Sequence, residues 1–311
     1  MVNRMKNKYV GVWPVMLTPF TEQRSVDYNA LESLIDWYVK AGVHGLFGLC
    51  QSSEMFFLSD KESQKIAKFI IDKVDGKIPV VVSGHTATDF SHQSEQLIAM
   101  SETGADSIIL ISNRLALQGE DNKITLNNLQ NLVQTLPEKI DLGIYECPYP
   151  YKRLLSDDIV KWCVDSERFT FIKDTCCDLN IIKQRALITN GSRLSLANAN
   201  SQTLLTSLQM GYRAFSGVMA NFHPELYVWL YENWEKNIEK AQILSSYLST
   251  AALVENLDYP ICAKYYQQKI GNFSTIQCRV RTSQNFMSSF YPQAIDDMGL
   301  LGEIITRSLD I

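Results

Sequence analysis

Eight short apolar runs recur between residues 10 and 218, and this repetition constrains the fold more than any other feature of the sequence. The runs are rich in Val, Ile, Leu and Phe, and amphipathic segments of helical length separate them. Near-continuous apolar strands are typical of a sheet buried on both faces, and strands that alternate with helices pair in parallel. The expected strands are 10–18, 44–50, 78–84, 107–112, 141–147, 169–175, 192–198 and 212–218.

Two of the intervening segments carry clear helix signals. The segment 27–42 places its apolar side chains on one helical face and reaches Gly42 where a helix should end. The next helix is expected to start at Ser59, because Glu62 follows at the spacing of a capping box. Eight such strand–helix units predict an α/β fold, a (β/α)8 TIM barrel, in preference to an open doubly wound sheet.

After residue 224 the strand signal stops, and the rest of the chain reads as helical. We expect residues 1–224 to form the catalytic barrel. Residues 225–311 should supply the last barrel helix and a helical C-terminal extension that covers the barrel or builds a subunit interface. No linker rich in Pro, Gly or Ser separates the two parts, so independent movement is not indicated.

Charge and composition limit the classes of partner. The 311 residues carry a net charge of -5 and no long Lys/Arg cluster, so nothing in the sequence attracts nucleic acid or an anionic membrane. The opening residues 1–13 are basic but lack an apolar segment, and no apolar stretch is long enough to span a membrane. We therefore expect a cytoplasmic protein. Its seven cysteines and four histidines show no metal-type spacing, which predicts reduced thiols, no metal and no cofactor.

Catalytic side chains of such barrels gather at the carboxyl ends of the strands. Lys173 is the most informative candidate, because it directly follows the apolar run 169–172. Partial desolvation there lowers the pKa of an amine and makes it a nucleophile toward a carbonyl carbon. A lysine paired with a carboxylate at the barrel mouth is an equal alternative. The same rule also selects Thr18, Ser52, Ser53, Glu54, His85, Arg114, Tyr145, Glu146, Asn198 and Asn200.

Two features near Lys173 would complement an amine nucleophile. Tyr145 ends the neighbouring strand, where its phenol can transfer protons as a carbinolamine forms and collapses, or simply fill the barrel top. In "CQSSEMF", the hydroxyls of Ser52 and Ser53 and several backbone N–H groups lie at a turn and suit a carboxylate. Serines in loops also commonly satisfy only the backbone.

Six parts of the chain, in the same order and register, resemble the family of dihydrodipicolinate synthase and N-acetylneuraminate lyase. The resemblance implies a (β/α)8 barrel and a class I aldolase that forms a Schiff base with pyruvate. The matching parts are "GVWPVMLTPF…VD", "GLFGLCQSSEMFFLS" at the family's GTTGE loop, "IPVVVSG" with "GADSIILIS", "IYECP" at YNxP, "FIKDT" at the lysine segment, and "YRAFSGVMANFHPE" at GxISxxAN.

By position, the resemblance implies Lys173 as the Schiff-base lysine and Tyr145 as the proton-transfer tyrosine. Ser52 stands at the second threonine of GTTGE, whose hydroxyl and N–H hold the pyruvate carboxylate. Glu146 replaces the asparagine of YNxP and is expected to act as an added acid, base or hydroxyl-binding group, or to pair outward with a basic neighbour. Glu54 is expected to fix the loop.

The chain departs from the family at several positions. Gln51 replaces a threonine that links two tyrosine hydroxyls, and Arg114 lies near the place of a tyrosine that reaches into the neighbouring subunit. Ser53 replaces a glycine, which would strain the turn if positive φ is still needed there. Pro150 replaces the arginine that binds aspartate semialdehyde in the synthase, with Arg153 three residues further on.

These features predict a lyase that acts on pyruvate or a 2-keto-3-deoxy acid through a lysine imine. A dehydratase using the same imine, or a catalytically idle barrel that binds a keto acid, are the alternatives. The lost arginine argues against true dihydrodipicolinate synthase. A homo-oligomer, either a dimer or a tetramer, is what the family implies.

Overall fold

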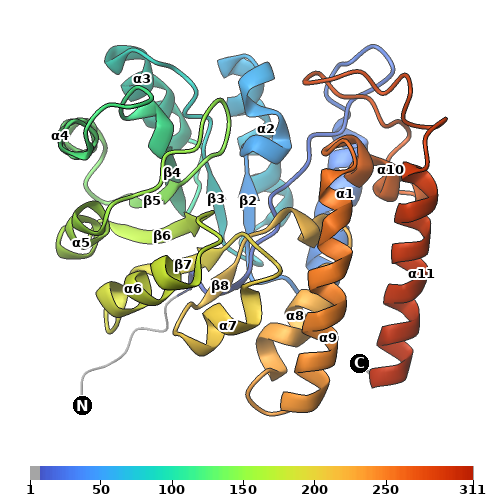
Figure 1. Ribbon diagram of the computed structural model, residues 1–311. Helices are drawn as coiled ribbons and strands as arrows, with labels where there is room; N and C mark the ends of the chain where they lie inside the picture. Colours follow the sequence, from blue (N-terminus) through green and yellow to red (C-terminus); the bar gives the residue numbers. More distant parts are fainter. Residues whose placement is uncertain (1–7, 311) are drawn as a thin grey trace.

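The computed structural model describes residues 8–310, and in it eight parallel strands curl into a barrel surrounded by helices (Figure 1). All eight predicted strands are present, which confirms the α/β barrel. Residues 1–7 of the basic opening segment lie outside the described residues. The strands are β1 Gly11–Val12, β2 Leu46–Gly48, β3 Val80–Val82, β4 Ser107–Ile111, β5 Asp141–Tyr145, β6 Phe169–Asp174, β7 Ser195–Asn198 and β8 Ala214–Phe215.

The sheet closes on itself between its first two strands. Its order is β1-β8-β7-β6-β5-β4-β3-β2, and Val15, just after β1, forms a parallel bridge with Phe47 of β2. The backbone N–H of Met16 also donates to the carbonyl oxygen of Phe47 at 2.9 Å. Because the strands are parallel and the ring is closed, their carboxyl ends meet at one rim.

The helices begin and end where local signals place them. Asp27 caps the first helix by accepting from the N–H of Ala30, and Gly42 follows its end with a φ of +77°. The predicted capping box of Ser59 and Glu62 is confirmed. The barrel helices are α1 Tyr28–Lys40, α2 Asp60–Val74, α3 Phe90–Ser101, α4 Asn122–Thr135, α5 Asp157–Asp165, α6 Leu179–Thr189, α7 Leu204–Gln209 and α8 Pro224–Asn233.

Apolar side chains fill two separate layers. One layer lies between the strands and the surrounding helices, and the other fills the barrel itself with Trp13, Phe47, Tyr145 and Phe171 among its members. Alternate residues of a strand point to opposite faces, so Phe171 and Lys173 share the inward face while Ile172 joins the outer layer. Lys173 therefore ends a stack of apolar side chains inside the barrel.

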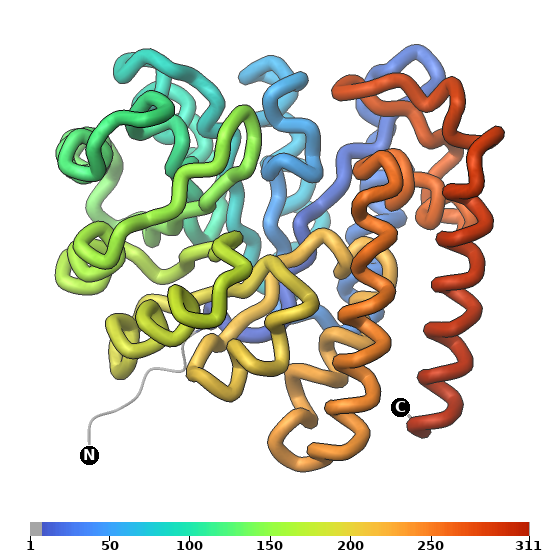
Figure 2. The backbone as a smooth tube through the Cα atoms, in the orientation of Figure 1, coloured from blue at the N-terminus to red at the C-terminus, as the bar shows by residue number. Residues whose placement is uncertain are grey.

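The chain after α8 continues as helices, as expected, and α9 and α11 run side by side along one flank of the barrel (Figure 2). The connection between α10 and α11 returns over the rim, where the Arg279 guanidinium donates to the backbone oxygens of Arg24 and Phe57. No helix among residues 8–310 is long and apolar enough to cross a membrane. The elements of this extension are α9 Ile238–Ala251, the 3-10 helix η5 Ala252–Asn256, α10 Ile261–Lys269 and α11 Tyr291–Leu309.

Candidate active site

Lys173 lies buried at the carboxyl end of β6, and among residues 8–310 it has no hydrogen-bond or ion-pair partner. Its residue surface is 3% exposed, and its Nζ lies 4.5 Å from the ring centre of Tyr145 and 5.9 Å from that of Phe47. Among residues 8–310 no carboxylate lies within ion-pair distance of this amine, so the alternative of a paired lysine does not apply. Burial lowers the pKa of Lys173 from 10.5 to about 8.

Tyr145 is the direct neighbour of Lys173 across two paired strands. The register of β5 and β6 pairs Tyr145 with Lys173, so both side chains point into the barrel at the same height. Its ring packs edge-on against Phe47 with ring centres 5.7 Å apart. Burial raises the pKa of Tyr145 well above its usual value, which keeps the phenol protonated. A neutral proton donor and a desolvated amine thus face the same space.

The turn after β2 brings Ser52 and Ser53 to this rim in different roles. Ser52 is buried, and its Oγ accepts a hydrogen bond of 2.8 Å from the hydroxyl of Tyr259. Ser53 donates from Oγ to the carbonyl oxygen of Met16 at 2.6 Å, which ties the turn to the end of β1. The positive φ of this turn falls on Glu54, at 58°, and not on Ser53, so the condition under which Ser53 would strain the turn is not met.

Gln51 lies in the turn after β2, and Arg114 lies in the turn after β4. The thiol of Cys147 donates to Oε1 of Gln51 over 3.6 Å. Burial raises the pKa of this thiol, and the positive charge of Lys173 acts in the opposite direction. The guanidinium of half-buried Arg114 stacks over the ring of Phe56 at 4.8 Å. Burial lowers the pKa of Arg114 from its usual value. Within residues 8–310 no hydrogen bond joins either side chain to Lys173.

Glu146 lies outside the mouth, so the expected role in substrate contact is wrong and the alternative, an outward pair with a basic neighbour, describes it. Its carboxylate is fully buried and accepts from the Arg185 guanidinium at 2.6 and 3.1 Å and from the N–H groups of Leu155 and Thr175 at 2.7 and 3.0 Å. Arg185 also pairs with Asp174 at 2.7 Å. Because Glu146 follows Tyr145 directly on the chain, its side chain takes the opposite face of the strand. We therefore leave Glu146 out of the proposed site.

Glu54 fixes the loop, as expected. Its Oε1 lies 2.6 Å from Nζ of Lys264, and its Oε2 accepts from the N–H groups of Arg279 and Val280 at 2.6 and 2.8 Å. Both Glu54 and Lys264 are buried. This ion pair joins the turn at the mouth to α10 of the C-terminal extension.

Two residues of the extension lie at the mouth and were not anticipated from the sequence. Tyr259 donates to Ser52, and Glu255 on η5 is half-buried with no hydrogen bond or ion pair among residues 8–310. The charge of Glu255 raises the pKa of Lys173, and burial raises the pKa of Glu255. Strand-end position gives no signal for either residue, because both follow α9.

The remaining strand-end candidates have structural partners. Thr18 donates to the carbonyl oxygen of Ser53 at 2.8 Å, and His85 accepts from the N–H of Ile111 at 3.0 Å. Burial lowers the pKa of His85 to about 4, so the ring is neutral. Asn198 and Asn200 hold the loop after β7 through Thr203 and Ser207.

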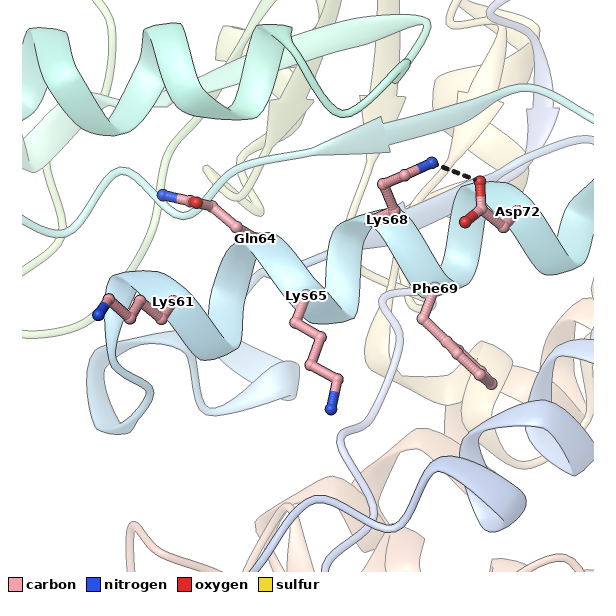
Figure 3. A pocket seen from close by; sticks show the side chains of 6 residues that line it. All are labelled: Lys61, Gln64, Lys65, Lys68, Phe69 and Asp72. Atoms are coloured by element: carbon pink, nitrogen blue, oxygen red, sulfur yellow. Dashed lines mark hydrogen bonds and ion pairs between the residues drawn. The ribbon is translucent and has the colours of Figure 1, made fainter.

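Elsewhere on the surface, the outer face of α2 forms a shallow hollow (Figure 3). Its side chains project from successive turns of the helix, and Lys68 pairs with Asp72 at 2.8 Å. The hollow includes neither Lys173 nor Tyr145. Within the described part of the chain no three His, Cys, Asp or Glu side chains are placed to hold a metal ion.

Comparison with known proteins places this geometry in a family. The model of the dihydrodipicolinate synthetase family matches residues 8–280. A 4-hydroxy-tetrahydrodipicolinate synthase from Methanococcus aeolicus is 28% identical over 225 residues, which cover 70% of this chain and 73% of the relative. One of the same name from Acetivibrio thermocellus is 24% identical over 303 residues, covering 94% and 98%.

Solved structures agree with the fold. A prophage protein of the dihydrodipicolinic acid synthase family from E. coli K12, in complex with pyruvate, superposes with a TM-score of 0.83 at 22% identity. The match covers 96% of this chain and 99% of that one. The pyruvate complex of a dihydrodipicolinate synthase from Acinetobacter baumannii gives a TM-score of 0.83 at 19% identity, covering 93% and 99%.

Proposed function

The chain belongs to the dihydrodipicolinate synthetase family, and on that premise we propose that Lys173 forms a Schiff base with pyruvate or another 2-keto acid. The protein is then a lyase that makes or cleaves a carbon–carbon bond through an imine and an enamine. The observation that carries the proposal is the buried amine of Lys173 beside the Tyr145 phenol, with no ion-pair partner in the described part of the chain. The mechanism needs no cofactor, because the lysine imine itself accepts the electron pair of the cleaved bond.

The amine is available because of its surroundings. With a pKa of about 8, roughly 10% of Lys173 is neutral at pH 7, against about 0.03% for an ordinary lysine. This difference raises the concentration of the nucleophile roughly 300-fold. The neutral amine attacks the C2 carbonyl carbon, the carbonyl oxygen takes up one proton from the amine and one from solvent and leaves as water, and a protonated imine remains. Tyr145 is the proton carrier within reach of both atoms.

The substrate carboxylate binds at the turn after β2. The hydroxyl of Ser52 and loop N–H groups supply neutral donors, and the Lys173 imine supplies positive charge. Gln51, which accepts from Cys147, and Arg114, which stacks on Phe56, border the same rim and are proposed to contact the rest of the substrate. The Ser53 hydroxyl is engaged with Met16, so Ser53 contributes to the shape of the turn.

The second half of the substrate is proposed to be a hydroxylated aldehyde, so that the full substrate is a 2-keto-3-deoxy sugar acid. Arg153, the one arginine near Pro150, donates to Thr125 at 3.0 Å and to the carbonyl oxygen of Glu120 at 3.0 Å. These bonds hold its guanidinium in the β4–α4 loop and away from a substrate carboxylate. We therefore do not propose the dihydrodipicolinate synthase reaction.

Dehydration of such a sugar acid through the same imine is the second candidate. The observation that favours it is Glu255, a half-buried carboxylate near Lys173 whose pKa is raised by burial. A carboxyl group with a raised pKa can give a proton to a departing hydroxyl.

The protein is further proposed to work in the cytoplasm as a homo-oligomer. The apolar side chains exposed on α11, which are Leu300, Leu301 and Ile304, support the proposed contact between subunits.

A turnover assay distinguishes these reactions. The protein is incubated with a panel of 2-keto-3-deoxy sugar acids, and the products are resolved by mass spectrometry. Cleavage gives pyruvate and an aldehyde whose masses sum to that of the substrate, whereas dehydration gives one product that is lighter by one water. The Lys173→Arg variant should lose either reaction. Turnover that survives in Lys173→Arg would refute the imine mechanism.

A further inference from the structure

The C-terminal extension sends one side chain into the barrel mouth. Tyr259 lies half-buried between η5 and α10, where burial raises the pKa of its hydroxyl well above the usual value. The partner of this hydroxyl is Ser52, which lies 207 positions earlier in the chain, in the turn after β2. A protonated donor from the extension thus reaches the proposed carboxylate site.

The hydrogen bonds at Tyr259 run in one direction. Nδ2 of Asn221 donates to the Tyr259 hydroxyl at 3.1 Å, and that hydroxyl donates to Oγ of Ser52 at 2.8 Å. Each hydroxyl has one proton, so Ser52 accepts from Tyr259 and keeps its own proton free to donate. No side chain or carbonyl among residues 8–310 accepts that proton. A buried hydroxyl in this state is a donor without an acceptor.

The start of the chain of hydrogen bonds is fixed by the barrel. Asn221 shares its Nδ2 protons with the carbonyl oxygens of Val15 and Val218, both at 3.0 Å, and its Oδ1 accepts from the hydroxyl of Tyr38. Asn221 therefore cannot turn its amide round without breaking these bonds. Its orientation sets the orientation of Tyr259 and, through Tyr259, that of Ser52.

We infer that Tyr259 is a positioning residue, which directs the Ser52 hydroxyl toward the carboxylate of a bound 2-keto acid. The anionic oxygen is the missing acceptor, and a hydrogen bond from a polarised hydroxyl to a carboxylate is short and strong. The carboxylate site is completed by the extension of the same chain. This inference rests on the proposed function, because it takes the 2-keto acid as the ligand.

The test is a double-mutant cycle on pyruvate binding, measured by isothermal titration calorimetry on the full-length protein. Tyr259→Phe removes only one hydroxyl and should weaken pyruvate binding roughly tenfold, as expected for loss of an oriented hydrogen bond to a charged group. Ser52→Ala should weaken it at least as much. In the Ser52→Ala background, Tyr259→Phe should have almost no further effect, whereas Ser52→Thr keeps the hydroxyl and should bind within a few-fold of the natural protein.

A matched control removes a hydroxyl from the same extension. Tyr247 on α9 donates to the carbonyl oxygen of Met298 at 2.6 Å and contacts His223, so Tyr247→Phe should leave pyruvate binding unchanged. Additive effects of Tyr259→Phe and Ser52→Ala, or equal weakening by both tyrosine variants, would overturn the positioning role.

The result for Tyr259 can be distinguished from the result for imine formation at Lys173. Pyruvate binding that follows this cycle, with no covalent adduct on Lys173, would refute imine chemistry and leave the role of Tyr259 in place. An adduct on Lys173 with an unchanged pyruvate affinity in Tyr259→Phe would do the reverse. No binding of pyruvate or of longer 2-keto acids to the natural protein would refute both.

Discussion

Replacing Lys173 by methionine should stabilise the protein at neutral pH. Methionine has a similar length and no charge, so it fills the space between Phe47 and Tyr145 without the cost of burying an ammonium. The pKa of Lys173 is about 8 in the folded protein, against an ordinary value of 10.5. This difference of about 2.5 pKa units corresponds to roughly 3 kcal/mol in the free energy of unfolding.

The sign follows from proton binding. Below pH 8 Lys173 is protonated in both states, and the folded state bears the full cost of desolvation. Between pH 8 and 10.5 the unfolded chain holds the proton more tightly, so the natural protein gains stability as the pH rises. The advantage of Lys173→Met should therefore fall from about 3 kcal/mol at pH 7 to about 2 kcal/mol at pH 9.

Urea unfolding followed by circular dichroism at the two pH values measures this difference, and Lys264→Met is the matched control. Lys264 is fully buried as well, but its Nζ lies 2.6 Å from Glu54. Its replacement strands a buried carboxylate and should destabilise the protein by about 3–5 kcal/mol. If both methionine variants lose stability to the same extent, the account of Lys173 as an unpaired, desolvated amine is refuted.

Three further predictions concern single side chains. Tyr145→Phe removes the proton carrier, so it should lower kcat by roughly 10²–10⁴-fold while the dissociation constant of pyruvate changes only a few-fold. Steady-state kinetics measures kcat and calorimetry measures the dissociation constant. A kcat near that of the natural protein would contradict this role of Tyr145. Arg185→Met should lower the free energy of unfolding by about 3–5 kcal/mol, because it strands Glu146; an unchanged urea midpoint would contradict the ion pair. The initial rate of adduct formation should rise with pH up to about 8. Because the negative charge of Glu255 raises the pKa of Lys173, Glu255→Gln should move this rise to lower pH. A pH profile shifted to higher pH would contradict this effect of Glu255.

The sequence predicted those features that depend on local pattern. Continuous apolar runs and helix caps specified all eight strands, and the strand-end rule placed Lys173 beside Tyr145 because paired parallel strands end at one rim. Glu146 also lies at the end of a strand, but its side chain points to the outer face of the sheet and not into the barrel. Its partner Arg185 lies on α6, and no spacing in the sequence shows which helical cation will meet a buried carboxylate.

Long-range contacts from the extension could not be predicted in the same way. Tyr259 and Glu255 belong to a helical segment, where apolar periodicity describes which face is buried but not which loop reaches the barrel mouth. The turn after β2 shows a second limit. The sequence leaves open whether the turn needs a positive φ at Ser53, and in the structure Glu54 takes it while Ser53 is bound to Met16 and Glu54 to Lys264.

The central claim, imine formation at Lys173, is tested most directly by borohydride trapping. The protein is incubated with pyruvate, reduced, digested and analysed by peptide mass spectrometry, with Lys173→Arg as the control. We predict a reduced pyruvyl adduct on Lys173 in the natural protein and no adduct in Lys173→Arg. The absence of any adduct with pyruvate and with longer 2-keto acids would contradict the account and favour a barrel that only binds keto acids.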